Sequence, residues 1–186
     1  GSSQQAVHFA AQGVMSGTQD VVIAGGVQNM TMIPIAAAMM VAKEYGHSDP
    51  FSGSKGWTER YGKQIVSQFA AAEMIAHKYE ISREDMEQLA FESHRRAIHA
   101  IDEGRFNNEI VPYGELTTDE GPRRGTTMEK MAELRTLAPE GRLTAATSSQ
   151  ISDGAAALLI VSEKALKEHG FKPRARIHHL SVRGDD

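Results

Sequence analysis

A chain of 186 residues, in which 40% of the side chains are hydrophobic and 24% are charged, has enough apolar material for a folded core. Its formal net charge of -4 gives no general electrostatic reason to bind nucleic acid or an anionic membrane. The sequence has no cysteine, which excludes disulfides and cysteine-ligated metals, and no apolar run long enough to span a bilayer. We therefore expect a soluble, cytoplasmic protein.

The segment 1–31 predicts a helix, a turn and a strand. Ser2 and Ser3 carry side-chain oxygens that can cap a first helical turn, and Gly17 suits the left-handed conformation that ends a helix. Apolar residues recur between them at three- and four-residue spacing. The β-branched run 21–24, closed by two glycines, predicts a central strand that is buried on both faces of a sheet.

The segment 27–31 predicts a polar turn at the carboxyl end of that strand, where α/β proteins commonly place functional groups. Two interpretations stay open: Asn29 caps the backbone of the turn, or the turn takes part in the functional site. The following residues, 32–62, are rich in Met, Gly, Ser and aromatic side chains. This composition indicates an excursion over the core.

Three helices are predicted in the middle of the chain. The apolar spacing of 64–79 predicts the first of them. A second, longer helix is expected to be capped by Ser82, with acidic residues in its first turn, and to end at Gly104. The stretch 126–135 predicts a short third helix.

Two pairs of histidines raise the question of a metal site. His94 and His99 are five residues apart in a predicted helix and therefore lie on different faces of it. His178 and His179 are adjacent in a predicted strand and point to opposite sides. We therefore expect no metal site, and we interpret the basic stretch around His94 as a solvated helix face.

The clearest motif is the small-residue stretch 143–157, which leads into the apolar run 155–161. Small side chains let a backbone pass close to a ligand, and the apolar run predicts a tightly packed strand. Ser162 is expected to cap a helix that ends at Gly170, and 175–182 predicts a further strand. Strand, helix and strand in this order indicate an α/β fold.

Several of these stretches resemble, in the same order, motifs of the thiolase family. They are the Gly-Ser-Ser opening turn with its helix, the segment Gly104-Arg105-Phe106 followed by Glu109-Ile110-Val111-Pro112, and the stretch 143–157, in which Thr147 replaces the usual asparagine. The resemblance covers essentially the whole chain.

The resemblance implies an α/β fold that forms the N-terminal half of the thiolase fold. This half is part of a five-stranded mixed sheet layered with helices, and it carries an inserted, mainly helical loop domain. Residues 1–31 and 144–186 then belong to the core. Residues 32–143 form the loop domain, which in thiolases covers the active site and holds coenzyme A.

The resemblance also assigns roles to four residues. Arg123 and Lys130 fall in the stretch that binds the nucleotide end of coenzyme A, and their charges suit a phosphorylated ribose. Ser149 occupies the position whose hydroxyl meets the pantetheine arm. Gln68 follows Ser67 where biosynthetic thiolases carry His-Met near the acyl group, which favours a different, bulkier acyl group. The alternatives are that the two cations only keep the surface soluble and that the serine only forms a turn.

The resemblance places no catalytic residue within the chain. The thiolase nucleophile is a cysteine, expected immediately before Gly1 at the start of a helix, where free amides and the helix macrodipole lower a thiol pKa. The other catalytic residues are expected beyond Asp186. The chain alone is therefore expected to be inactive as a thiolase, to bind ligand at most, and to aggregate or pair with more protein, because its strands lack neighbours.

In a complete enzyme the chain is expected to belong to a homodimer or homotetramer that acts on acyl-CoA, with a coenzyme A thioester as substrate and no cofactor. The family reaction is thiolytic cleavage of 3-ketoacyl-CoA or its formation by Claisen condensation. The opening turn, the segment Gln28-Asn29-Met30 and the 182–186 end look most like degradative actinobacterial thiolases of lipid or steroid catabolism. Two alternatives remain: a non-catalytic coenzyme A-binding or dimerising module, and a sterol-carrier-type thiolase-like protein.

Overall fold

The computed structural model describes residues 1–48, 50–51, 53–64 and 66–184. Ile65, in the predicted helix 64–79, and the last two residues, Asp185 and Asp186, lie outside the described residues. The chain divides into two compact units. Unit 1 comprises residues 1–41 and 152–186, and unit 2 comprises residues 42–151.

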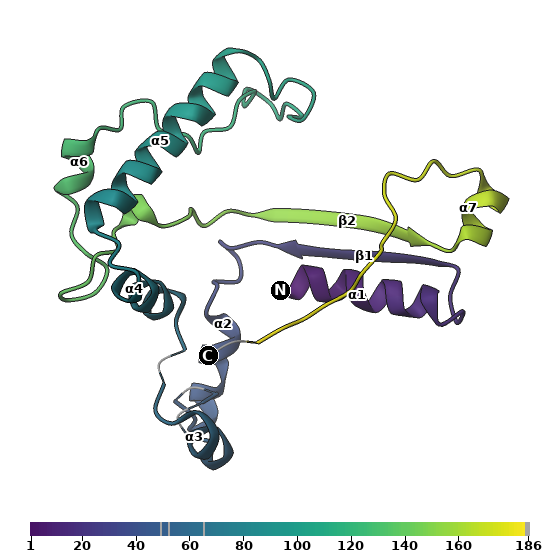
Figure 1. The fold of residues 1–186 in the computed structure, drawn as a ribbon, viewed down its shortest axis with the longest axis horizontal. Helices are drawn as coiled ribbons and strands as arrows, with labels where there is room; N and C mark the ends of the chain where they lie inside the picture. Colours follow the sequence, from purple (N-terminus) through teal and green to yellow (C-terminus); the bar gives the residue numbers. More distant parts are fainter. Residues whose placement is uncertain (49, 52, 65, 185–186) are drawn as a thin grey trace. The chain divides into compact units, whose positions relative to one another are not determined.

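Unit 1 is a small α/β unit built from both ends of the chain (Figure 1). Its elements are α1 (Ser2–Met15), β1 (Val21–Gln28), α2 (Ala37–Met40), β2 (Gly154–Val161) and α7 (Glu163–His169). The strands β1 and β2 pair antiparallel, with Val21 opposite Val161 at one end and Gln28 opposite Gly154 at the other. Helix α1 runs along this sheet in Figure 1 and contributes Ala10 to a core.

That core lies on one face of the sheet only. Ala24 of β1 and Ile160 of β2 are buried there together with Ala10. On the other face Ile23 stands opposite Leu159, and these side chains are 71% and 51% exposed. The prediction of a strand buried on both faces is therefore wrong for the described residues, because within unit 1 helix α1 covers a single face.

The predicted end of the first helix is confirmed, whereas its predicted start and the predicted end of the first strand differ from the structure. The first helix ends as predicted, with Gly17 at a φ of 74°. The predicted serine cap is wrong: Gly1 is the N-cap residue and no side chain caps the helix, because Ser2 already lies inside the first turn. Strand β1 also continues past the two glycines, which pair with Ala157 and Ala156 of β2.

The C-terminal part of unit 1 begins as predicted and then differs. Ser162 accepts a hydrogen bond from the Ala165 amide at 3.1 Å and caps α7, which ends at Gly170 in the left-handed conformation. The segment 175–182 forms no strand with any residue that the structure describes. An apolar alternation becomes a strand only where a neighbouring backbone offers hydrogen bonds.

The turn after β1 is held by side chains. The Asn29 side-chain oxygen accepts from the Met32 amide at 2.9 Å, so Asn29 caps the turn as one of the two interpretations proposed. The Met30 amide donates to the Asp153 carboxylate at 2.7 Å, although the two residues are far apart in sequence. Whether the turn takes part in a functional site stays a prediction.

Unit 2 is mainly helical (Figure 1). A 3₁₀ turn, η1 (Val41–Tyr45), leads into it, and its further elements are α3 (Lys55–Tyr61), α4 (Gln68–Lys78), α5 (Arg83–Asp102), α6 (Met128–Ala132) and the 3₁₀ turn η2 (Ala145–Thr147). Helix α5 opens with a capping box between Ser82 and Asp85 and is followed by Gly104 at a φ of 69°, as predicted.

Two helices of unit 2 are shorter than predicted. Helix α4 starts at Gln68 because the Ser67 side chain accepts from the Ala70 amide and fixes the start there. Helix α6 is capped in the same way by Thr127, whose hydroxyl accepts from the Lys130 amide. In the part of the chain that the structure describes, no helix is both long and apolar enough to cross a membrane.

Candidate ligand-binding site

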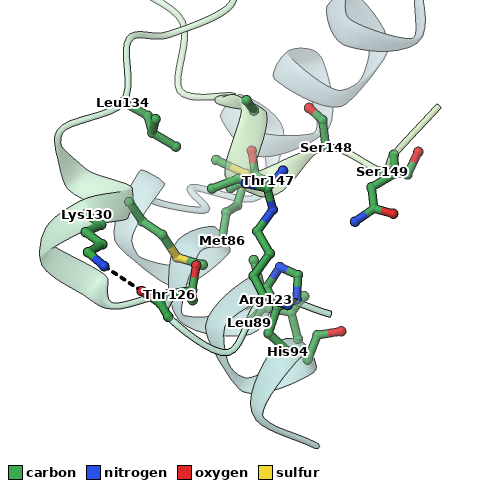
Figure 2. Close-up of a pocket in the computed structure, with 17 residues that line it drawn as sticks. Met86, Leu89, His94, Arg123, Thr126, Lys130, Leu134, Thr147, Ser148 and Ser149 are labelled. Atoms are coloured by element: carbon green, nitrogen blue, oxygen red, sulfur yellow. Dashed lines mark hydrogen bonds between the residues drawn. The ribbon is translucent and has the colours of Figure 1, made fainter. Parts of the chain in front are cut away.

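A groove of about 870 Å³ lies within unit 2, between α5, α6 and the segment 145–150 (Figure 2). The groove is therefore formed by the long helix α5 and by two segments that follow it in the sequence. The lining residues are Met86, Leu89, Ala90, Ser93, His94, Arg123, Gly125, Thr126, Lys130, Met131, Leu134, Ala145, Ala146, Thr147, Ser148, Ser149 and Gln150.

The lining combines cations with apolar side chains. Arg123 and Lys130 supply two positive charges, and no carboxylate stands among the described residues that line the groove. Methionine and leucine side chains from α5, α6 and the residues after α6 supply the apolar part. Such a lining suits a ligand that has anionic groups next to an apolar or aromatic body.

Arg123 and its neighbour Arg124 have different surroundings. The Arg124 guanidinium donates to the Asp102 carboxylate at 2.6 and 3.0 Å, and these bonds lower the pKa of Asp102. Arg123 makes no ion pair with a described residue, and its backbone amide donates to the His94 Nδ1 at 3.2 Å. In Figure 2 the Arg123 side chain extends from beside the His94 ring across the centre of the groove. Its guanidinium is therefore available to a ligand.

Lys130 is partly engaged. Its Nζ donates to the Gly125 carbonyl at 2.7 Å, the bond drawn as a dashed line in Figure 2. An ammonium group has three donors, so two remain for a ligand. The bond also closes the loop that leads into α6, which orients the lysine.

Arg83 holds helix α6 against α5. Its Nη2 donates to three carbonyls at the C-terminal end of α6, those of Met131, Ala132 and Leu134, at 2.8 to 3.0 Å. Its Nε donates to Glu87 at 2.7 Å, and Glu87 is only 3% exposed. The arginine thus donates to carbonyls at and just after the end of α6 and pairs a buried carboxylate.

The segment that carries Ser149 is tied to α4 and to itself. The Glu73 carboxylate accepts from the backbone amides of Arg142 and Leu143 at 2.7 and 2.8 Å. Thr144 is completely buried and caps η2, and the Ser148 hydroxyl donates to the Thr144 carbonyl at 2.9 Å. The exposed Ser149 hydroxyl bonds to no described residue, so its donor and acceptor are available at the groove.

The structure brings together three of the four residues that the sequence singled out. Arg123, Lys130 and Ser149 all line the groove. Gln68 is exposed at the first position of α4 and is not among the lining residues. These placements leave the four assigned roles as predictions.

Sequence reasoning missed three positioning side chains. His94 was interpreted as part of a solvated face, but it is half-buried and lines the groove. Arg95, Arg96 and His99 follow the prediction, since all three are exposed and the two arginines bond to Glu92. The four-residue spacing of Met86, Ala90 and His94, which places them on one helix face, was the signal that could have found it. The roles of Arg83 and Glu73 depend on long-range backbone partners and had no comparable signal.

No group of three or more histidines or carboxylates that could hold a metal ion occurs among the described residues. The groove combines two cations with apolar side chains, and the fold is an α/β unit with a helical second unit.

Comparison with known proteins shows the family. The family profile described as "Thiolase, N-terminal domain" matches residues 1–164. A solved structure of an acetyl-CoA acetyltransferase from Syntrophomonas wolfei aligns with a TM-score of 0.68 and 35% identity, over 92% of this chain and 45% of that chain. This chain belongs to the thiolase family, and the predicted family and fold class are confirmed.

Curated relatives agree over the whole chain. A steroid 3-ketoacyl-CoA thiolase of Mycobacterium tuberculosis is 54% identical over 100% of this chain and 46% of its own length. A 3-ketoacyl-CoA thiolase of Psychrobacter arcticus is 40% identical over 100% of this chain and 47% of its own length. The chain spans about half the length of the curated relatives that it matches. The mycobacterial relative agrees with the predicted resemblance to actinobacterial steroid thiolases.

Proposed function

We propose that this chain is the N-terminal half of a thiolase that cleaves 3-ketoacyl-CoA with coenzyme A, or forms it by condensation, in lipid or steroid degradation. The substrate is a coenzyme A thioester, and the reaction needs no metal or other cofactor. The enzyme acts in the cytoplasm as a homodimer or homotetramer. The relatives named as steroid and 3-ketoacyl-CoA thiolases support this proposal.

The observation that carries the proposal is the groove of unit 2, where Arg123, Lys130 and Ser149 line one space. We assign Arg123 and Lys130 to the phosphorylated ribose of coenzyme A, since a guanidinium fork and an ammonium point charge both bind phosphate. Ser149 then bonds to the pantetheine arm. Unit 2, residues 42–151, overlaps the predicted loop domain 32–143, and we propose that this unit holds coenzyme A.

We also propose that the nucleophilic cysteine directly precedes Gly1 and that the residues which transfer protons follow Asp186. The start of α1 supports the first part. No side chain caps this helix, so its first backbone amides and the positive end of its dipole remain available to stabilise a thiolate. Within the chain itself, the described residues bind and orient the substrate.

Binding of coenzyme A by the intact polypeptide that contains these residues tests the groove. Arg123→Ala should weaken coenzyme A binding about tenfold or more, because a hydrogen bond to a charged group contributes about 1.5 to 3 kcal/mol. Arg96→Ala is the matched control, since Arg96 bonds to Glu92 on the exposed side of α5 and does not line the groove. Equal affinities for the two variants would contradict the assignment.

Two further measurements sharpen this test. Phosphopantetheine lacks the nucleotide, so Arg123→Ala should leave the affinity for phosphopantetheine unchanged. Ser149→Ala should weaken the binding of both phosphopantetheine and coenzyme A. Thiolysis of a long-chain or steroidal 3-ketoacyl-CoA by the intact polypeptide then separates an enzyme from a module that only binds. Binding without any turnover would favour the non-catalytic alternative.

A further inference from the structure

We propose that His94 is a positioning residue for the groove: its neutral imidazole accepts the Arg123 backbone amide and so holds the Arg123 guanidinium over the ligand. This inference rests on the proposed function, because it takes coenzyme A as the ligand of the groove. It adds a residue to which neither the family motifs nor the sequence pattern gave a role.

Arg123 lies in the segment 121–126, here called the arginine loop. The attachment of this loop to α5 carries the argument. The Arg123 amide lies 3.2 Å from the His94 Nδ1, and the neighbouring Arg124 side chain bonds to Asp102 near the end of the same helix. Positions 94 and 102 are eight residues apart, about two helical turns, and so lie close to one helix face. The loop is thus fastened to α5 at two points, one on each side of the Arg123 side chain.

A third contact fastens the start of the loop. The Gln150 side-chain amide donates to the Gly121 carbonyl at 2.8 Å, which ties the loop to the segment that carries Ser149. Of these contacts, the one through His94 is the only described side-chain bond made to Arg123 itself. Loss of this bond should therefore disturb Arg123 more than its neighbours.

The bond defines the state of the ring. A nitrogen that accepts a hydrogen bond carries no proton, so the neutral ring has its proton on Nε2. The Nε2 group makes no hydrogen bond or ion pair with a described residue, and His94 lines the groove. The charged side chains next to it on α5, Arg95 and Arg96, are both engaged with Glu92. His94 therefore acts on Arg123 through Nδ1.

Three substitutions of His94 separate positioning from other roles. The side-chain oxygen of His94→Asn can occupy the place of Nδ1 and accept the same amide. His94→Gln places its oxygen near the position of Nε2, and His94→Ala removes both. We expect His94→Ala and His94→Gln to raise the dissociation constant for coenzyme A about fivefold, the usual effect of one neutral hydrogen bond. His94→Asn should stay close to wild type.

Steady-state kinetics and a double-mutant cycle in the intact polypeptide add readouts that a merely structural role would not move. The KM for coenzyme A should rise in His94→Ala while kcat is unchanged, because chemistry occurs elsewhere. In an Arg123→Ala background His94→Ala should have no further effect on affinity, since its action passes through Arg123. An undiminished effect in that background would overturn the proposal.

Hydrogen exchange of a peptide that covers 121–126 tests the bond without any ligand. Protection of this peptide should fall in His94→Ala and His94→Gln and remain in His94→Asn; equal protection in all three variants would overturn the proposal. If Arg123→Ala leaves coenzyme A affinity unchanged, the proposed function of the groove fails. If Arg123→Ala weakens binding but His94→Ala does not, only the role of His94 fails.

Discussion

The two units are held together by different forces. In unit 1, apolar side chains of α1, β1 and β2 form the core, and the described long-range side-chain hydrogen bonds all go to two aspartates, Asp20 and Asp153. In unit 2, side chains on helices bind backbone groups of distant segments. Arg83 on α5 binds carbonyls at the end of α6, and Glu73 on α4 binds amides of the segment before η2. Arg142, which lies in that segment, donates in return to the carbonyls of Ala76 in α4 and Ile81 after it.

The difference follows from the length of the elements. The groove is built partly from α6, which has five residues, and η2, which has three, and such short pieces neither bury enough apolar surface nor persist alone. Polar anchors on α4 and α5 fix them instead. In unit 1 a helix of 14 residues lies against two strands of eight, so apolar packing suffices. The groove of unit 2 is thus positioned by directional hydrogen bonds.

The largest effect is expected from Arg83→Ala in unit 2. The Glu87 side chain is only 4% exposed, so the substitution leaves a buried carboxylate without its partner and removes the donor for three carbonyls at and just after the end of α6. We expect a local loss of about 3 to 5 kcal/mol. Hydrogen exchange of peptides from α5 and α6 in the intact polypeptide measures it. The control is Arg95→Ala, which breaks an exposed ion pair. A comparable loss of stability in that variant would contradict the view that contacts of Arg83 hold α6 in place.

The next largest effect is expected from Ile160→Ala in unit 1. Ile160 is 9% exposed and packs in the core with Ala10 and Ala24. Truncation of a buried isoleucine to alanine costs about 2 to 4 kcal/mol, and Ile160→Val about 1 kcal/mol. Exchange of β1 and β2 peptides should follow this order while α5 is unchanged. Equal exchange in both variants would show that apolar packing is not what holds the sheet.

A smaller effect is expected from Asp153→Ala, which removes one of the two aspartates that accept the described long-range hydrogen bonds of unit 1. Its carboxylate accepts the Met30 amide at 2.7 Å on the surface. The loss of one such bond costs about 1 kcal/mol and should be confined to the turn after β1. Exchange at the Met30 amide is the readout, and Asp153→Asn, which keeps an acceptor oxygen, should retain most of the protection.

The smallest effect is a difference in acid titration. Hydrogen bonds from Arg95 and Arg96 lower the pKa of Glu92 in unit 2 to about 2, and those from Ser162 and Lys164 lower the pKa of Asp20 in unit 1. A carboxyl group whose pKa is lowered by folding stabilises the folded state at pH values above its ordinary pKa, which is 4.5 for Glu92. This contribution to stability is lost as the pH falls through the folded-state pKa of about 2. Carbon-13 NMR titration of labelled glutamate checks Glu92; a midpoint near 4.5 would refute the pairing.

The local sequence determined most of the elements and the family. Serine caps at Ser82 and Ser162, glycine ends at Gly17 and Gly104, and the small-residue stretch 143–157 are signals that act over a few residues, so they survive in any context. The same stretches, in order, were enough to identify a thiolase and to select Arg123, Lys130 and Ser149.

Only the tertiary structure decided which side chains hold the groove in place. The partners of His94, Arg83 and Glu73 are backbone groups 29, 48 and 69 or more residues away, and a backbone amide or carbonyl carries no mark in the sequence. It also decided that β1 is covered on one face and that 175–182 is not a strand, because burial and pairing depend on what lies beside a segment and not on its own residues.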